Sequence, residues 1–135
     1  PKYVFVTLDT GHASLGGIDP VKLLRTHYDR VAHMHFKDCP AEYSADKGVW
    51  KGPAPPQAEH KRRNLYQRMG AGGVDFPAIM QILRQRGFSE WVTMDFTAPR
   101  PEEGSIELEM DHNKRYLVDK LKVTLRNNYY ANATS

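Results

Sequence analysis

Three short apolar segments alternate with helix-forming segments along this chain of 135 residues, and this alternation restricts the fold more than any other feature. The segments predicted as strands are 3–9, 31–37 and 91–97. Helices are predicted from Asp19 onward, after Asp75, and over 105–125. A repeating order of strand and helix predicts parallel strands covered by helices, which is an α/β fold.

Local signals place the ends of the predicted helices. Asp19 and Pro20 provide an N-cap followed by a proline in the first turn. Asp75 is the cap of the next helix, and Gly87 is its stop. The residues before Asp19, over 10–18, are expected to form a loop. In the last helix, the apolar stripe is predicted to consist of Met110, Leu117 and Leu121.

The longest segment without a clear pattern runs over 38–73 and is rich in proline, glycine and charge. Loops of this length are uncommon in a compact domain and tend to be functional or partly helical. We expect one short helix in it, over 59–69. Residues 1–125 are therefore predicted to be one folded unit with this long loop, followed by a tail over 126–135.

Each predicted strand has one apolar face and one face that becomes polar towards its carboxyl end. The apolar residues are Val4, Val6, Leu8, Ala32, Met34, Phe36, Val92, Met94 and Phe96. The polar residues opposite are Asp9, His33, His35, Lys37 and Asp95, with His12 just after the first strand. A doubly wound sheet would be apolar on both faces, whereas a parallel barrel gathers polar groups at its carboxyl ends. The alternative is that each strand end tolerates a polar residue independently.

Two carboxylates and an imidazole on neighbouring strand ends predict a site for a divalent cation. Asp9, His35 and Asp95 would supply oxygen, nitrogen and oxygen ligands to Mn²⁺, Mg²⁺, Co²⁺ or Zn²⁺. A metal would also supply the counter-charge that buried carboxylates need. Asp9 has an alternative role as a helix or loop cap, and His35 has one as a hydrogen-bonded core histidine.

Three further polar residues are interpreted as parts of the same site. His33 lies deeper on the face of His35 and is expected to support the site or contact the substrate without binding the metal. Lys37 shares that face, which favours a buried, substrate-facing lysine over a surface lysine. Asp38 is interpreted as a substrate contact, and its alternative role is to cap the next segment.

Composition limits the possible function classes. The net charge of +3 is too small and scattered to indicate nucleic-acid binding. No apolar run reaches the ~18 residues that a membrane span needs. The single cysteine, Cys39, cannot form an internal disulfide, so a reducing compartment such as the cytoplasm is expected.

The motifs LDTGH, HMHFKD and GAGGVDFPAI, followed by WVTMDF, resemble the xylose isomerase-like TIM barrels of the sugar phosphate isomerase/epimerase superfamily. The DTGH and HxHxKD forms are most similar to its myo-inosose dehydratase-like members. The resemblance covers about 3–123 and implies a partial (β/α) barrel that matches the last three of eight βα units. Because such an arc leaves two open sheet edges, we expect further barrel units from the same gene or another chain, or a homo-oligomer.

The resemblance also implies roles for the strand-end residues. Asp9 and His35 match metal ligands, and Asp95 stands where the family has a glutamate ligand, one methylene longer. His12 and Lys37 match residues near the substrate and are the expected catalytic groups. The implied activity is a metal-dependent dehydratase, isomerase or epimerase that forms an enolate from a sugar, polyol or cyclic keto-alcohol.

Two other function classes remain open from the sequence. A binding or regulatory module that kept the fold and lost the reaction is favoured by Asp95 and by the absence of an upstream glutamate ligand. A nuclease is suggested by the basic loop over 47–68, but these strands provide too few histidines for the usual nuclease metal cluster.

Overall fold

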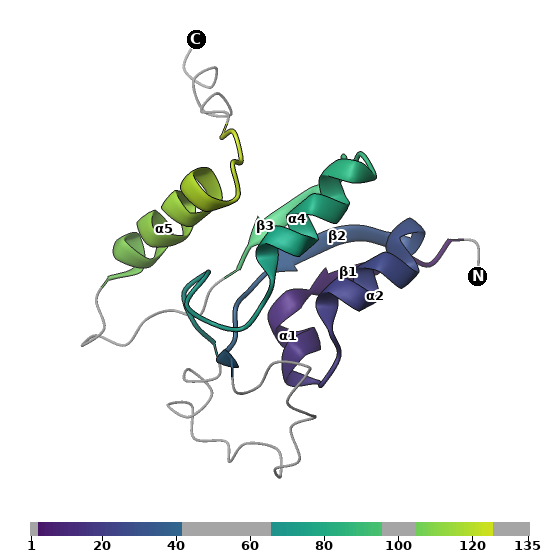
Figure 1. The fold of residues 1–135 in the computed structure, drawn as a ribbon, viewed down its shortest axis with the longest axis horizontal. Coiled ribbons are helices and arrows are strands. Elements are labelled where there is room, and N and C mark those ends of the chain that lie inside the picture. Colours follow the sequence, from purple (N-terminus) through teal and green to yellow (C-terminus); the bar gives the residue numbers. More distant parts are fainter. Residues whose placement is uncertain (1–2, 42–65, 96–104, 126–135) are drawn as a thin grey trace.

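A computed structural model describes residues 3–41, 66–95 and 105–125, which form one parallel sheet with helices beside it (Figure 1). The strands, in spatial order, are β1 (Val6–Asp9), β2 (Val31–Phe36) and β3 (Trp91–Met94). The helices are α1 (Thr10–Leu15), α2 (Pro20–His27), α4 (Phe76–Gln85) and α5 (Ile106–Arg115). Helix α2 continues into the 3₁₀ turn η1 (Tyr28–Arg30), and α5 continues into the π turn η6 (Tyr116–Lys120). The predicted α/β class with parallel strands is confirmed.

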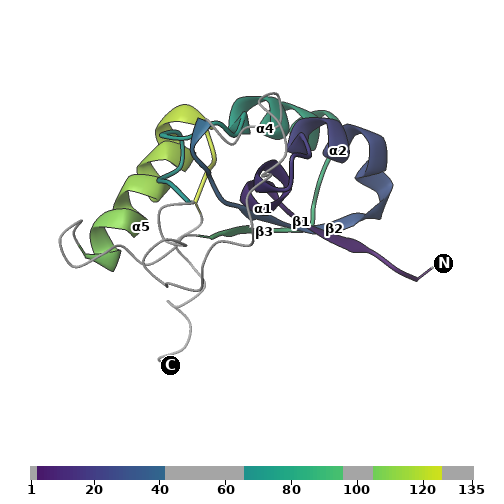
Figure 2. The same ribbon diagram turned by 90° about the horizontal axis from the view of Figure 1, so that it is seen from below.

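The core lies between one face of the sheet and helices α2 and α4, which lie on the same side of it (Figure 2). The buried residues from these elements are Leu8, Val31, Met34, Phe36, Leu24, Phe76, Ile79, Ile82 and Leu83. The rings of Phe36 and Phe76 lie 5.3 Å apart at their centroids and join β2 to α4. Burial of aromatic and aliphatic side chains on one side of the strands fixes which face remains for the polar residues.

The opposite face of the sheet has no helix over it in the described ranges. His33 pairs with Trp91 in the parallel register, and His35 pairs with Thr93, so these side chains share that face. Trp91 is 71% exposed. An exposed tryptophan on an uncovered sheet face is the surface that further strands of a barrel would cover.

The first strand differs from the prediction at its amino-terminal end. It begins at Val6, not at residue 3, and the register with β2 is irregular between Val6 and Thr7. Val4 and Val6 were predicted on the buried face but are 54% and 44% exposed, whereas Leu8 is buried. The irregular register ends the simple alternation there, so only the part of the strand beyond it follows the expected pattern.

A helix replaces part of the loop that was predicted over 10–18. Helix α1 starts directly at Thr10, because the Asp9 side chain accepts a hydrogen bond of 2.8 Å from the His12 N–H and caps it. The predicted caps at Asp19 and Asp75 are confirmed by hydrogen bonds to the N–H groups of Val21 and Ala78. Gly87, with φ of +66°, follows the end of α4 as predicted.

The last helix is shorter than predicted and exposes a different face. It is α-helical only to Arg115. Of the predicted apolar stripe, Met110 is 46% exposed, whereas Leu117 and Leu121 pack on the core as predicted. Glu109 and Asn113 are buried instead. Glu109 accepts a hydrogen bond from Arg68, and Asn113 accepts one from the Met69 N–H. Because both partners lie in the segment before α4, this face of α5 is polar. In the helix predicted over 59–69, residues 59–65 lie outside the described part, and 66–69 are not helical.

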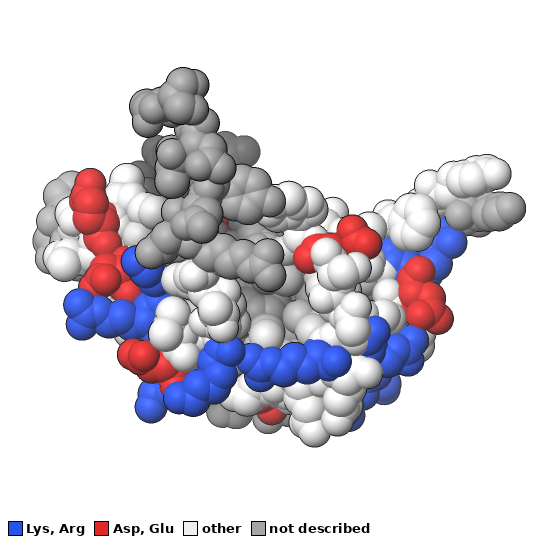
Figure 3. Space-filling model, turned by 90° about the horizontal axis from the view of Figure 1, so that it is seen from above, with Lys and Arg blue, Asp and Glu red and all other residues white. Residues whose placement is uncertain are grey.

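Side chains of both charges are interspersed over the face shown in Figure 3. Exposed ion pairs include Arg86 with Asp29 at 2.8 Å and Arg115 with Asp111 at 2.7 Å. Such pairs contribute about 0–1 kcal/mol each and do little to set the fold. Among the described residues, no helix is both long and apolar enough to span a bilayer.

Candidate functional site

Asp9, His35 and Asp95 come together at the carboxyl ends of the three strands. His35 Nδ1 lies 3.8 Å from Asp9 Oδ2 and 3.6 Å from Asp95 Oδ2. One ligand atom from each of the three residues lies within 4.8 Å of the other two. All three side chains are partly exposed, so the cluster is open to a ligand.

The parallel register explains why these residues meet. Asp9 pairs directly with His35 across β1 and β2. Asp95 follows β3, and its N–H donates to the Phe36 carbonyl at 3.0 Å, which extends the ladder by one residue beyond Met94. Because paired residues of parallel strands direct their side chains to the same face, one carboxylate lies on each side of the central imidazole.

The donor set fits a divalent cation. Oxygen and nitrogen ligands sit about 2.0–2.2 Å from Zn²⁺ or Mg²⁺, which places neighbouring donor atoms roughly 3–3.5 Å apart. The separations of 3.6 and 3.8 Å at His35 need only a small inward shift to reach this range. Two carboxylates beside each other repel one another, and a cation between them would remove that cost. Two carboxylates and an imidazole are ligands that Mn²⁺, Co²⁺ and Zn²⁺ accept.

Of the two roles that the sequence left open for Asp9, the structure shows the cap, and the second carboxylate oxygen faces His35 and His12. Its Oδ1 accepts from the His12 N–H at 2.8 Å and caps α1. Its Oδ2 faces His35 at 3.8 Å and His12 Nδ1 at 3.4 Å. The capping bond holds the carboxylate in one orientation, so the second oxygen is positioned for a ligand without further ordering.

Lys37 enters the site from the residue after β2. Its Nζ donates to Asp95 Oδ2 at 3.1 Å, and its side chain is only 11% exposed. The prediction that the Lys37 side chain is buried and points into the site is therefore confirmed. His12 lies beside Asp9, on α1, with 61% of its side chain exposed.

The residues between Asp9 and His12 fix the backbone of Lys37. The buried Thr10 hydroxyl donates to the Lys37 carbonyl at 2.7 Å and lies 2.9 Å from the Lys37 N–H, which donates to it. A Cβ at Gly11 would lie 3.1 Å from both the Lys37 Cγ and its carbonyl oxygen, so only glycine allows this approach without displacement. In the DTGH motif, Asp9 thus caps the helix and Thr10 bonds the backbone of Lys37. Gly11 allows the close approach to Lys37, and His12 follows it.

Thr10→Val should lower the free energy of unfolding by about 1–3 kcal/mol, because it leaves the buried N–H and carbonyl of Lys37 without their partner. Denaturant titration of the full-length protein measures this. Thr10→Ser keeps the hydroxyl and should retain most of the stability. Thr26 is the matched control, because its hydroxyl also bonds a carbonyl, of Lys22, but at an exposed position. An equal loss in Thr26→Val would show that Lys37 has no special dependence on Thr10.

Tyr66 is a site residue that the sequence analysis missed. Its ring centroid lies 4.2 Å from Lys37 Nζ and 5.5 Å from the centroid of the His12 ring. Burial, and then the nearby Asp9 and Asp95 carboxylates, raise the pKa of the Tyr66 hydroxyl to about 12. Tyr66 lies within the long loop over 38–73, in the short helix predicted over 59–69, and no pattern connected it to the strand ends.

His33 lies deeper on the same face as predicted. Its ring is 4.9 Å from that of His35, and its Nε2 lies 2.8 Å from the Thr93 hydroxyl on β3. These contacts fit the expected supporting role, because a hydrogen bond across the strands orients one imidazole against the next. Substrate contact by His33 stays a prediction.

Asp38 is buried and surrounded by backbone amides. Its carboxylate accepts from the N–H groups of Cys39, Gly70, Gly72 and Val74 at 2.8–3.1 Å. Burial raises the pKa of this carboxyl, and the four hydrogen bonds oppose that shift. A Cβ at Gly72 would collide with Asp38 and with the Cys39 carbonyl. The geometry favours the capping role that the sequence left as the alternative, and the substrate contact predicted for Asp38 gains no support from it.

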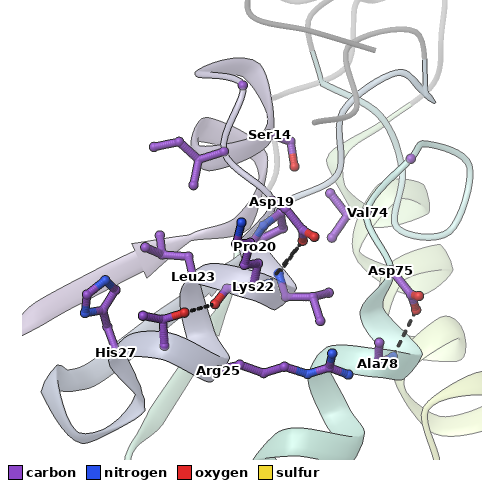
Figure 4. Close-up of a pocket in the computed structure, with 15 residues that line it drawn as sticks. Ser14, Asp19, Pro20, Lys22, Leu23, Arg25, His27, Val74, Asp75 and Ala78 are labelled. Atoms are coloured by element: carbon purple, nitrogen blue, oxygen red, sulfur yellow. Dashed lines mark hydrogen bonds between the residues drawn. The ribbon is translucent and has the colours of Figure 1, made fainter. Parts of the chain in front are cut away.

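A second depression lies away from the strand ends, between α1, α2 and the start of α4 (Figure 4). It encloses about 860 Å³, and its lining includes none of Asp9, His35 and Asp95. The amides that start α2 and α4 point into this region, but Asp19 and Asp75 already accept from them (Figure 4). An anion would have to displace these caps, so the strand ends remain the candidate site.

Comparison with known proteins identifies the architecture. The model of the family described as xylose isomerase-like TIM barrel matches residues 1–116. Among solved structures, the probable 3-DHS dehydratase AsbF from Bacillus anthracis, involved in petrobactin synthesis, aligns with a TM-score of 0.51 at 19% identity. That alignment covers 79% of this chain and 37% of the other, and it supports the fold alone.

Several curated proteins are similar in sequence. An inosose dehydratase from Lacticaseibacillus casei is 28% identical over 104 residues, and one from Bacillus licheniformis is 30% identical over 95 residues. Each alignment covers 70% of this chain and 31% of the relative. The rhizopine catabolism protein MocC from Rhizobium meliloti is 30% identical over 94 residues, covering 68% of this chain and 27% of the relative. The chain thus spans about a third of the length of these relatives.

Proposed function

The chain belongs to the xylose isomerase-like TIM barrel family, and from that premise we propose that it carries part of the active site of a divalent-metal-dependent dehydratase. The substrate class is a sugar, a polyol or a cyclic keto-alcohol, as the names of the inosose dehydratases suggest. Strands β1 and β3 are the edges of the sheet, where further strands of a closed barrel would pair. The rest of the barrel is the expected macromolecular partner.

Asp9, His35 and Asp95 are the residues that would hold the metal in this proposal. The observation in favour is their convergence, with one ligand atom of each within 4.8 Å of the other two. When bound, a divalent cation would act as a Lewis acid towards a substrate carbonyl and favour loss of a proton from the neighbouring carbon.

His12 and Lys37 supply the proton transfers. His12 lies beside the metal ligands with an exposed ring, so it can take the proton from the carbon next to the carbonyl. Lys37, as an ammonium group, can donate a proton to the hydroxyl that leaves from the next carbon. The C–H and C–O bonds break, a carbon–carbon double bond forms, and water departs. Proton exchange with solvent restores both side chains.

The position of Lys37 is the observation that carries the dehydratase assignment. Its Nζ lies 3.1 Å from Asp95 Oδ2, whereas His12 Nδ1 lies 3.4 Å from Asp9 Oδ2. An acid at that point is what elimination of a hydroxyl requires, whereas an isomerase or epimerase returns the proton to carbon. One proton-transfer group beside each carboxylate of the cluster, His12 as base and Lys37 as acid, thus supports elimination.

Turnover of an inosose by the full-length protein should depend on a divalent metal. Purified protein treated with a chelator should lose activity to background, because the carbonyl then lacks its Lewis acid. Addition of Mn²⁺, Mg²⁺, Co²⁺ or Zn²⁺ singly should restore it, and the enone product can be followed by NMR and ultraviolet absorbance.

The outcomes of this assay separate the competing functions. A rearranged keto-alcohol without loss of water would replace the dehydratase by an isomerase or epimerase. Metal binding without turnover on a panel of keto-polyols would favour a binding module. Turnover that survives complete metal removal would contradict the proposal itself.

A further inference from the structure

The Tyr66 ring lies between the two proposed proton-transfer groups without a part in the reaction so far. It is 4.2 Å from Lys37 Nζ, over the face of the ring, and 5.5 Å from the His12 ring in an edge-on arrangement. Its hydroxyl makes no hydrogen bond with any described residue. The hydroxyl lies near enough to Asp9 and Asp95 for their carboxylates to raise its pKa, but the face of the ring is the part of Tyr66 that contacts Lys37.

Helix α5 holds the segment that carries this ring. The Arg68 guanidinium binds the buried Glu109 carboxylate, with Nε to Oε1 at 2.6 Å. The Met69 N–H donates to the buried Asn113 side chain at 3.0 Å, and the Met69 carbonyl lies 3.2 Å from His112 Nε2. These contacts explain why α5 buries polar residues. Its buried side chains form hydrogen bonds with Arg68 and Met69, and they are not part of an apolar stripe.

A second attachment fixes the same segment to the end of β2. The Gln67 N–H donates to the Asp38 carbonyl at 3.1 Å, in an isolated antiparallel bridge. Asp38 directly follows Lys37 in the chain. Tyr66 thus precedes a residue that is hydrogen-bonded to the neighbour of Lys37, so the ring and the lysine are held in register with each other.

A lysine in this place needs such support. Its side chain has several rotatable bonds, and its one hydrogen bond to a described side chain is to Asp95 Oδ2 at 3.1 Å. The negative face of an aromatic ring attracts an ammonium group and excludes water from it. With Asp95 on one side and Tyr66 on another, Nζ is confined beside the metal-ligand cluster.

We propose that Tyr66 is a positioning residue for Lys37, whose ring holds the ammonium group beside Asp95 where the leaving hydroxyl would be protonated. This inference rests on the proposed function for its catalytic consequence, but the placement of Lys37 by the ring is independent of any substrate. The ring is held in place by segment 66–69, which is bound to α5.

A double-mutant cycle in the full-length protein tests the catalytic consequence. Tyr66→Leu should lower kcat about tenfold, the scale of a partly buried cation–π contact, with KM and metal content little changed. Tyr66→Phe should recover most of the turnover. In a Lys37→Met background, Tyr66→Leu should cause less than about a twofold further loss, because the two residues act as one unit.

Tyr28→Leu is the matched control, because it removes a similar ring over a cation, Arg86 at 4.4 Å, outside the site. It should leave kcat near the wild-type value. Equal losses from Tyr66→Leu in both backgrounds would overturn the proposal, since Tyr66 would then act on the substrate directly. A Phe variant as slow as the Leu variant would overturn it too, because the hydroxyl would be the important group.

NMR of lysine labelled with ¹³C at Cε tests the placement without any turnover. The Lys37 methylene, assigned by its absence in Lys37→Met, should be shifted upfield by the ring current in wild type and in Tyr66→Phe. In Tyr66→Leu it should return to the position of exposed lysines such as Lys22. An unshifted Lys37 signal in wild type would contradict the placement whether or not the protein proves to be a dehydratase.

Discussion

Lys37→Met should reduce turnover of the true substrate by at least about 100-fold, the scale of general acid–base catalysis, with metal content unchanged. Methionine roughly keeps the volume of lysine and removes its proton and charge. The Lys37 ammonium is the only group of this kind that the described residues place beside Asp95, at 3.1 Å. Loss of turnover without loss of metal would show that Lys37 acts in proton transfer and not in metal binding.

Lys22→Met is the control for this variant, because Lys22 is an exposed lysine on α2 outside the strand-end cluster. It should retain wild-type turnover. Metal content, measured in parallel, distinguishes a chemical effect from collapse of the site. Near-normal turnover in Lys37→Met would remove this lysine from the mechanism and leave His12 as the proton-transfer group.

The strand-end cluster was predictable because strand periodicity is a strict rule. Side chains alternate every residue, so polar residues at matching positions in three parallel strands must meet on one face. The register bears this out where it pairs Asp9 with His35. Asp95 followed from the same rule, although it lies one residue beyond β3. The inward orientation of Lys37 came from its parity with His35.

Features that depend on tertiary contacts were not visible in the sequence. Helix α1 starts within the DTGH motif, whose glycine and histidine are weak helix formers, because Asp9 caps it. Tyr66 reaches the site because the residues after it are bound by Glu109 and Asn113 of α5 and by the Asp38 carbonyl. No periodicity relates residues more than forty positions apart, as the contact between Arg68 and Glu109 requires.

Asp38 shows why neighbouring polar residues can have unrelated roles. It follows Lys37 directly and was interpreted with it as part of the substrate site. Its carboxylate instead accepts from four backbone N–H groups, three of which belong to the segment 70–74. Sequence position cannot tell a carboxylate that faces a ligand from one that organises a turn, because both follow the same strand end.

Removal of two of the proposed metal ligands should have the second large effect. In the double variant Asp9→Ala, His35→Ala, only Asp95 of the three residues remains, and a single carboxylate that already binds Lys37 cannot hold a divalent cation tightly. We expect metal affinity to fall by at least about 100-fold, since loss of outer contacts to a ligand alone already costs 10–100-fold. Turnover should fall with it.

Asp119→Ala, His27→Ala is the matched double control, because it removes one carboxylate and one imidazole at exposed positions outside the cluster. Its metal content should equal that of the wild-type protein. Loss of metal in both double variants would point to general destabilisation, which a thermal melt of each variant would detect.

The central claim is that the strand ends of this chain bind one divalent cation through Asp9, His35 and Asp95. Elemental analysis of the full-length protein, loaded with Mn²⁺ and separated from free metal, tests it most directly. The predicted result is about one ion per chain in the wild-type protein and in Asp119→Ala, His27→Ala, and almost none in Asp9→Ala, His35→Ala. Stoichiometric metal in that last variant would contradict the account.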